Sequence, residues 1–273
     1  MNFTVCPLCG HRDVEARDHH AAHCPRCQVL INLDTSPLDY SEGGGQAVPD
    51  GAKMRWRLEN AKRRFRIMAP WLNDIDVLVD IGCGSGEMLM AGKERFPLRV
   101  GFDTNRPLIE HIKRSGDGMA VQGHFDPNLL PRETDGKRKL FSLSHVLEHL
   151  ADPTTLFDLV VSAMQARDLL YIEVPLFTGE SFRRQGYSWS LWNAEHVVLF
   201  SLDALRFLAD RAGLETLRSG TRIFARGSHS SKLRLRLLRN SPIRTLKAAI
   251  SKPDYLSLAD VLVADYGYML LRR

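Results

Sequence analysis

Four cysteines near the start of the chain are spaced like the ligands of a metal ion. They form two Cys-x-x-Cys pairs, Cys6 with Cys9 and Cys24 with Cys27, separated by fourteen residues. Each pair places two thiolates on one tight turn, and two such turns complete a tetrahedral set of sulfur ligands typical of zinc. Because four thiolates leave no open coordination position, we expect a structural zinc site. Nearby histidines could replace a ligand, although the set is complete without them: His11, His19, His20 and His23.

Three glycines follow a short apolar segment and could bring the backbone close to a ligand. Residues 77–81 are mostly apolar, and Gly82, Gly84 and Gly86 come next at alternate positions. Glycine lets a chain approach a bound molecule where a side chain would block it. The spacing is not that of a dinucleotide-binding loop, and the Lys-Ser/Thr of a phosphate-binding loop is absent. Seventeen residues after Gly86, Asp103 ends another apolar segment, where its carboxylate could bind two ribose hydroxyls.

Apolar segments alternate with helical patterns along the rest of the chain, and these elements must position the residues above. The expected strands are residues 77–81, 98–102, 119–122, 140–143, 169–174, 214–224 and 267–271. The expected helices are residues 53–72, a stretch ending at residue 95, and residues 108–114, 156–165 and 201–212, the last with Ser201 as its N-cap. Such alternation predicts an α/β fold with a doubly wound parallel sheet.

Four motifs occur in a fixed order along residues 55–225. They are V-L-V-D-I-G-C-G-S-G-E, the acidic end of R-V-G-F-D-T, F-S-L-S-H-V-L-E-H-L-A-D-P, and H-V-V-L-F-S followed by a helix and A-G-L. Together they resemble the class I S-adenosylmethionine-dependent methyltransferases, and the third motif is similar to that of a bacterial H-V-L-E-H-L subgroup. The resemblance implies a seven-stranded, mostly parallel, Rossmann-like sheet.

The resemblance also implies where S-adenosylmethionine would bind. The glycine loop would line the methionine part, with Asp80 beside it, and Asp103 would bind the ribose hydroxyls. Either Phe125 or Asp126 would lie near the adenine, and Ser144 would lie with His145 beneath the transferable methyl group. The implied cofactor contacts are Asp80, Gly82, Cys83, Gly84, Gly86, Asp103, Thr104, Phe125, Asp126 and Ser144.

Methyl transfer from a sulfonium is an in-line displacement, which requires alignment of the acceptor and sometimes removal of its proton. Imidazole titrates near neutral pH, so His145, His149 and His196 are the candidate catalytic residues. Glu148 is a further candidate base. Alternatively, Glu148 and His149 only brace the helix that follows.

Residues 182–192 follow the fifth expected strand and should border the acceptor pocket. Tyr187, Trp189 and Trp192 could stack on a sugar or a planar acceptor, or could simply pack as a lid. Arg183 and Arg184 could bind an anion or form a solvated pair. The seven basic residues between positions 53 and 66 indicate a solvated helix face.

The net charge of +5 has a local origin. Residues 216–253 hold ten Lys and Arg side chains and no acidic ones, and the remaining residues carry 27 basic and 32 acidic side chains. In the resembled fold this basic segment includes the insertion between the last two strands, which would lie near the pocket. It therefore favours an anionic acceptor or a negatively charged surface, with a solvated face as the alternative.

These observations predict three parts: a zinc ribbon at 1–35, a linker at 36–52, and a methyltransferase domain at 53–273 with a basic insertion at about 226–262. The leading hypothesis is methyl transfer from S-adenosylmethionine to a small-molecule or glycoconjugate acceptor. One alternative is an RNA methyltransferase that binds rRNA or tRNA through the zinc ribbon and basic segments, and another is a non-catalytic zinc-ribbon binding module. With no signal peptide pattern and no apolar run long enough to span a membrane, we expect a cytoplasmic protein, with peripheral membrane contact as an option for the basic segment.

Overall fold

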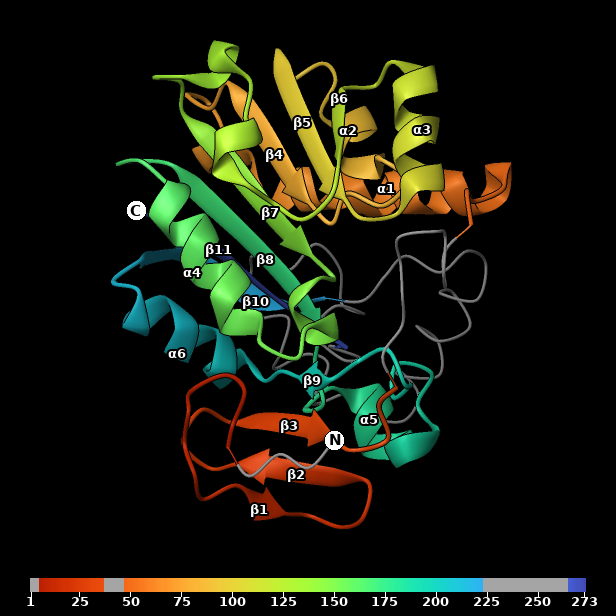
Figure 1. Cartoon of the computed structure of the whole chain (residues 1–273), viewed down its shortest axis with the longest axis vertical. Helices are drawn as coiled ribbons and strands as arrows, with labels where there is room; N and C mark the ends of the chain where they lie inside the picture. Colours follow the sequence, from red (N-terminus) through yellow and green to blue (C-terminus); the bar gives the residue numbers. More distant parts are fainter. Residues whose placement is uncertain (1–4, 37–46, 223–264) are drawn as a thin grey trace, which may run out of the picture.

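The computed structural model describes residues 5–36, 47–222 and 265–273. Its main element is a seven-stranded sheet with the strand order β10-β11-β8-β7-β4-β5-β6 (Figure 1). The strands are β4 (Val77–Ile81), β5 (Leu98–Asp103), β6 (Met119–Gln122), β7 (Lys139–Ser144), β8 (Leu169–Pro175), β10 (Glu215–Arg222) and β11 (Tyr266–Arg272). The pairs among β4 to β8 are parallel, whereas β11 is antiparallel to both β8 and β10. This confirms the predicted seven-stranded, mostly parallel, Rossmann-like sheet.

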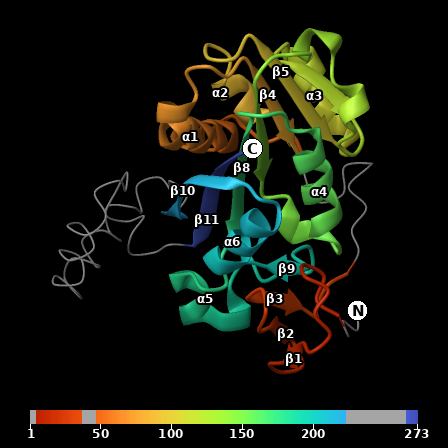
Figure 2. The same cartoon turned by 90° about the vertical axis from the view of Figure 1, so that its left-hand side faces the viewer.

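Helices cover both faces of this sheet, and α1 and α4 lie on opposite sides of it (Figure 2). The helices are α1 (Gly51–Met68), α2 (Glu87–Ala91), α3 (Arg106–Ser115), α4 (Pro153–Ala163), α5 (Glu180–Gln185) and α6 (Leu202–Arg211). Alternation along each strand builds the two cores: Val77 and Val79 of β4 pack in the core that includes α4 and α6, whereas Leu78 packs with α1, α2 and α3. Short 3-10 turns complete the chain: η1 (Ala69–Trp71), η2 (Pro127–Leu129), η3 (Arg132–Thr134), η4 (Leu147–His149) and η5 (Gly186–Ser188).

Local capping sets the ends of the helices. The Asp50 side chain accepts a hydrogen bond from the amide of Lys53 at 2.8 Å and starts α1, and Ser201 caps α6 through the amide of Ala204 at 3.0 Å, as predicted. The prediction of a helix extending to residue 95 was wrong, because α2 ends at Ala91. Gly92 follows it, and glycine is a poor residue for continuing a helix.

A second, smaller sheet contains the N-terminal segment and has the order β1-β2-β3-β9. Its strands are β1 (Glu15–Ala16), β2 (Ala21–Cys24), β3 (Val29–Asn32) and β9 (Val198–Leu199). The last of these strands, β9, comes from the late part of the chain and pairs antiparallel with β3 (Figure 1). In this pair Leu30 is opposite Leu199. The N-terminal sheet therefore shares both hydrogen bonds and a core with the rest of the protein.

Two predicted segments lie mainly outside the described residues. The basic insertion at about 226–262 lies there entirely, and the linker at 36–52 does so for residues 37–46. In the portion that the structure does describe, no helix has both the length and the apolar character needed to cross a membrane.

Candidate active site and metal centre

The glycine loop lies between the end of β4 and the start of α2. Gly82 has a φ of +70°, and a Cβ there would come within 2.5 Å of Val146, which follows β7. Gly84 has a φ of +53°, but a Cβ there would meet no atom within 4 Å. Gly82 thus allows the loop to pack against the chain after β7, while Gly84 leaves its backbone open to a ligand.

Asp103 joins the glycine loop to the end of β5. One of its carboxylate oxygens, Oδ2, accepts a hydrogen bond from the amide of Gly84 at 2.8 Å. The other, Oδ1, accepts one from the amide of Asn105 at 2.8 Å. The structure therefore brings together two of the predicted site residues, with the half-buried Thr104 beside them.

Asp80 lies within β4, between Gly101 of β5 and Ser142 of β7. The side chain is buried, and this burial raises the pKa of Asp80 to about 7 even though a hydrogen bond from Ser142 opposes the shift. Asp80 is therefore poised to change charge near neutral pH beneath the glycine loop.

Two other predicted cofactor contacts have side chains in the core. Cys83 packs beside Gly101, where a Cβ would come within 2.7 Å of the Cys83 sulfur, and burial raises the pKa of this thiol well above its usual value. Phe125 contacts Phe102 edge to face at a centroid distance of 5.2 Å. Because the Cys83 side chain is buried in this way, a ligand would meet Cys83 through its backbone. Asp126, in contrast, is half-buried and accepts a hydrogen bond from the amide of Asn128 at 2.9 Å.

Arg57 of α1 extends over the glycine loop. Its Nη1 donates a hydrogen bond to the Ser85 hydroxyl at 3.0 Å and lies 4.0 Å from a carboxylate oxygen of Glu87. Sequence patterns alone do not distinguish Arg57 from the six other basic residues at positions 53–66. It is a candidate for binding an anionic group held by the loop.

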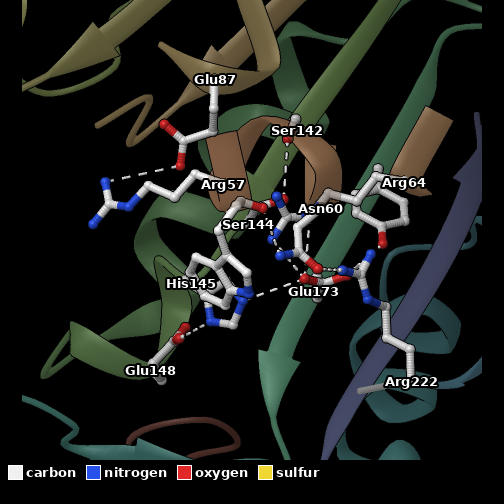
Figure 3. A network of polar contacts seen from close by, with 12 residues as sticks. Arg57, Asn60, Arg64, Glu87, Ser142, Ser144, His145, Glu148, Glu173 and Arg222 are labelled. Carbon is white, nitrogen blue, oxygen red and sulfur yellow. Dashed lines mark hydrogen bonds and ion pairs between the residues drawn. The ribbon is translucent and has the colours of Figure 1, made fainter. Parts of the chain in front are cut away.

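His145 follows β7 directly and is fixed between two carboxylates (Figure 3). Its Nδ1 lies 3.1 Å from Oε1 of Glu148, and its Nε2 lies 3.2 Å from Oε1 of Glu173. Burial disfavours a charged imidazole, but the two carboxylates outweigh it and raise the pKa of His145. A protonated histidine held in this way suits a positioning role better than proton abstraction.

Glu173 of β8 is the centre of a buried ionic cluster that sequence reasoning missed (Figure 3). Arg64 of α1 donates to its Oε1 from Nη2 at 2.7 Å, Arg222 of β10 lies 3.2 Å from its Oε2, and the Tyr171 hydroxyl donates to Oε2 at 2.7 Å. Burial opposes ionisation of Glu173, yet the two guanidinium groups hold its pKa well below the usual range. The prediction that the basic face of α1 is solvated was wrong at Arg64, which is 4% exposed.

His149 and His196 lie next to one another, with ring centroids 4.6 Å apart and planes at 74°. Nδ1 of His149 lies 3.1 Å from the carbonyl oxygen of Glu195, and Nδ1 of His196 lies 2.6 Å from that of Leu191. Carbonyl oxygens only accept, so both rings carry their proton on Nδ1 and use Nε2 as an acceptor or ligand. Burial lowers the pKa of His196, which favours its neutral form.

The aromatic residues after β8 form a packed layer instead of an open platform. Trp189 and Trp192 are buried with Phe182 against the N-terminal sheet. The Tyr187 hydroxyl donates to Asp18 at 2.5 Å. Of the two interpretations considered for this loop, the structure supports packing. Arg183 and Arg184 are exposed and pair with Glu180.

The four N-terminal cysteines converge, with all four sulfur atoms within 4.8 Å of one another. The sulfur atoms of Cys6 and Cys27 are 3.5 Å apart, as are those of Cys9 and Cys24. Zinc–sulfur bonds of about 2.3 Å in a tetrahedron place sulfur atoms roughly 3.8 Å apart. The geometry therefore fits a tetrahedral metal ion such as the predicted zinc.

Comparison with known protein families identifies a methyltransferase domain in this chain. The sequence pattern of a family described as a methyltransferase domain matches residues 54–219. No curated protein matches the sequence.

Several solved structures share the fold. An S-adenosylmethionine-dependent methyltransferase from Archaeoglobus fulgidus is 21% identical, with a TM-score of 0.54 over 81% of this chain and 98% of that one. Magnesium protoporphyrin IX methyltransferase from Synechocystis is 12% identical, with a TM-score of 0.52 over 84% and 90%. An S-adenosylmethionine-dependent methyltransferase from Mesorhizobium loti is 15% identical, with a TM-score of 0.52 over 79% and 100%. At these identities the likeness concerns the fold alone.

Proposed function

The chain belongs to the methyltransferase-domain family, and on that premise we propose that it transfers a methyl group from S-adenosylmethionine to a small-molecule or glycoconjugate acceptor. The observation that carries this proposal is the hydrogen bond from the Gly84 amide to Asp103, which puts an open glycine backbone next to a carboxylate at the ends of β4 and β5. Ligands of open α/β sheets bind at these carboxyl ends.

The proposed cofactor position follows from the loop. The methionine part would lie along Gly82, Gly84 and Gly86, and its carboxylate would face Arg57, whose guanidinium lies 3.0 Å from Ser85 of the same loop. The ribose hydroxyls would bind Asp103 with Thr104 beside it. A carboxylate has about four acceptor sites, so Asp103 can accept from the ribose while keeping its two backbone hydrogen bonds. Either Phe125 or Asp126 would lie near the adenine.

The proposed chemistry is an in-line displacement. A nucleophilic atom of the acceptor forms a bond to the methyl carbon while the carbon–sulfur bond breaks and its electron pair stays on sulfur, which gives S-adenosylhomocysteine. His149 or His196 would remove the acceptor's proton, since each imidazole is oriented by a backbone carbonyl oxygen that its Nδ1 contacts. His145 would act by orienting Glu148.

The acceptor proposed here is anionic, because residues 216–253 carry ten basic and no acidic side chains, which would attract a negatively charged molecule. The same residues and the cysteine-bearing N-terminal sheet make RNA the second candidate acceptor. An RNA acceptor predicts binding that weakens steeply with salt, because each phosphate contact releases counterions.

A methyl-transfer assay tests the proposed function. The protein is incubated with radiolabelled S-adenosylmethionine and with separate RNA, glycoconjugate, lipid and small-metabolite fractions from the source cell. We expect label in a non-RNA fraction with wild type and the exposed control Asp135→Ala, and at least about tenfold less with Asp103→Ala, from the loss of hydrogen bonds to a charged group. Label in RNA alone would identify RNA, the second candidate, as the acceptor. Label in no fraction would contradict enzymatic methyl transfer.

A further inference from the structure

A second group of potential metal ligands lies at the carboxyl end of β7, apart from the four cysteines. Glu148 and His149 belong to η4, and His196 comes just before β9. One carboxylate oxygen of Glu148 and one ring nitrogen from each histidine all lie within 4.8 Å of one another. Two segments almost fifty residues apart in sequence thus supply two imidazoles and a carboxylate to one point.

An unsatisfied buried atom indicates that a ligand belongs at this point. Glu148 is fully buried, with an exposed fraction of 0%. Its Oε1 is bonded to His145 at 3.1 Å, whereas its Oε2 is buried and has no hydrogen-bond partner among the described residues. A buried carboxylate oxygen without a partner is costly, so native structures usually pair such an oxygen with a donor or a cation.

The surrounding contacts orient each side chain for coordination. The carbonyl oxygens of Glu195 and Leu191 hold the Nδ1 atoms of His149 and His196, which assigns Nε2 as the ligand atom of both rings. His145 holds Glu148 through Oε1 and leaves Oε2 for the ion. Backbone hydrogen bonds of this kind are the usual outer contacts of histidine ligands.

We propose that Glu148, His149 and His196 bind a divalent first-row transition-metal ion. Two imidazoles and one carboxylate suit zinc, manganese or iron and leave open coordination positions, whereas calcium prefers six to eight oxygen ligands. In this arrangement the two histidines are ligands, and the bound ion takes over the proton-removal role proposed for them above.

The role of the ion rests on the proposed function. The site follows β7 directly, and Val146 of the same segment packs against Gly82 of the glycine loop. The open positions would bind a hydroxyl of the acceptor and lower its pKa, so that the proton passes to solvent. The oxygen then bonds to the methyl carbon as the carbon–sulfur bond breaks. The proposal therefore names a hydroxyl-bearing acceptor and O-methylation.

Metal binding can be measured without cofactor or acceptor. Protein that has been loaded with zinc and passed through a desalting column is analysed for zinc per chain, and Mn²⁺ binding to the zinc-free site is followed by the loss of the free Mn²⁺ electron paramagnetic resonance signal. Mn²⁺ favours nitrogen and oxygen ligands, so it reports on this site and not on the cysteines. We expect one tightly bound Mn²⁺ in wild type and in His124→Gln, a control at an exposed histidine.

His149→Gln and His196→Gln should each weaken Mn²⁺ binding by at least about tenfold and lower the zinc content by one ion per chain. Glu148→Gln should do the same. If the variants at the buried residues Glu148 and His196 fail to fold, His149→Gln still tests the proposal, because His149 is only half-buried. Unchanged Mn²⁺ affinity in folded His149→Gln, or no Mn²⁺ binding by wild type at millimolar concentration, would overturn the proposal. Calorimetry with S-adenosylmethionine on the same samples shows separately whether the proposed function fails.

Discussion

The side-chain amide of Asn32 donates a hydrogen bond to the backbone carbonyl of His196 at 2.9 Å. The same Nδ2 donates to the carbonyl of Asn193 at 2.9 Å, and the amide of Asn32 donates to the carbonyl of Val197 at 2.9 Å. Asn32 is fully buried and ends β3, only five residues after Cys27. The N-terminal sheet therefore fixes the segment that carries His196, which links the cysteine site to the proposed acceptor side.

Removing the Asn32 side chain should take a donor from the buried carbonyl of His196 and from the half-buried carbonyl of Asn193, of which only the second keeps another donor among the described residues, the amide of His196. We expect Asn32→Ala to lower the free energy of unfolding by about 1–3 kcal/mol per unsatisfied group, measured by urea denaturation. The exposed Asn73 provides a matched control, and Asn73→Ala should change stability by less than about 0.5 kcal/mol. Equal stability of the two variants would show that the Asn32 hydrogen bonds do not hold the His196 segment.

Removal of the proposed metal ion from the cysteine site should loosen β9 as well as β3, because the two strands pair at Leu30–Leu199 and Ile31–Val198. We expect a chelator, or Cys24→Ser, to speed amide hydrogen exchange in both strands by at least about tenfold, equivalent to ~1.4 kcal/mol of local stability. Exchange in β4 and β5 of the main sheet should change little. Fast exchange confined to residues before β3 would contradict the structural link.

Glu173 should make a pH-dependent contribution to stability. Its pKa in the folded protein is well below the ordinary 4.5, so its stabilising effect is present above pH 4.5 and is lost as the pH falls through the folded-state value. Glu173→Gln should destabilise the protein by about 3–5 kcal/mol at pH 7, because two buried arginines lose their shared carboxylate.

The difference between wild type and Glu173→Gln should shrink as the pH falls below 4.5, as measured by urea denaturation across the acid range. Glu215→Gln is the control, since Glu215 pairs with Arg272 on the surface and should contribute less than about 1 kcal/mol. A difference that stays constant with pH would contradict the assigned ionisation of Glu173.

Substitution at Gly84 separates folding from cofactor binding. A Cβ at Gly84 meets no atom within 4 Å, so Gly84→Ala should cost only the ~1–2 kcal/mol of a left-handed alanine. Its methyl group would occupy the space proposed for the cofactor, and affinity for S-adenosylmethionine should fall by at least about tenfold, from steric exclusion at the loop.

Gly136 offers a matched control, because it has a φ of +66° and equally open surroundings but lies away from the loop. Gly136→Ala should show the same loss of stability with unchanged cofactor affinity in calorimetry. Equal affinities of the two variants would place the cofactor elsewhere.

Periodicity and capping signals predicted most elements of the main sheet, because apolar runs and the cap at Ser201 are local features of the sequence. The end of α2 was missed, since the expected helix was extended through the charged residues 93–95, whereas the helix ends at Ala91, before Gly92. The pairing of β9 with β3 could not be anticipated, because a two-residue strand has no detectable periodicity and its partner lies more than 160 residues away.

The site was predictable where a motif is contiguous, as in the glycine loop and H-V-L-E-H-L, and less so where burial decides. Arg64, Glu173 and Arg222 come from three distant segments, and their pairing depends on the packing of α1, β8 and β10. A lone acid within the apolar strand L-L-Y-I-E-V was the one available signal for Glu173. The roles of the three histidines likewise depend on partners such as Glu148 and the carbonyl of Leu191, which only the fold brings together.

The most direct test of the account is isothermal titration calorimetry with S-adenosylmethionine, using wild type, Asp103→Ala and the exposed control Asp135→Ala. We predict one binding site per chain in wild type and in the control, and an affinity about 10- to 100-fold lower in Asp103→Ala, corresponding to roughly 1.4–2.8 kcal/mol. Absence of binding by folded wild type, or equal affinity in Asp103→Ala, would contradict the proposed binding of this cofactor between the glycine loop and the end of β5.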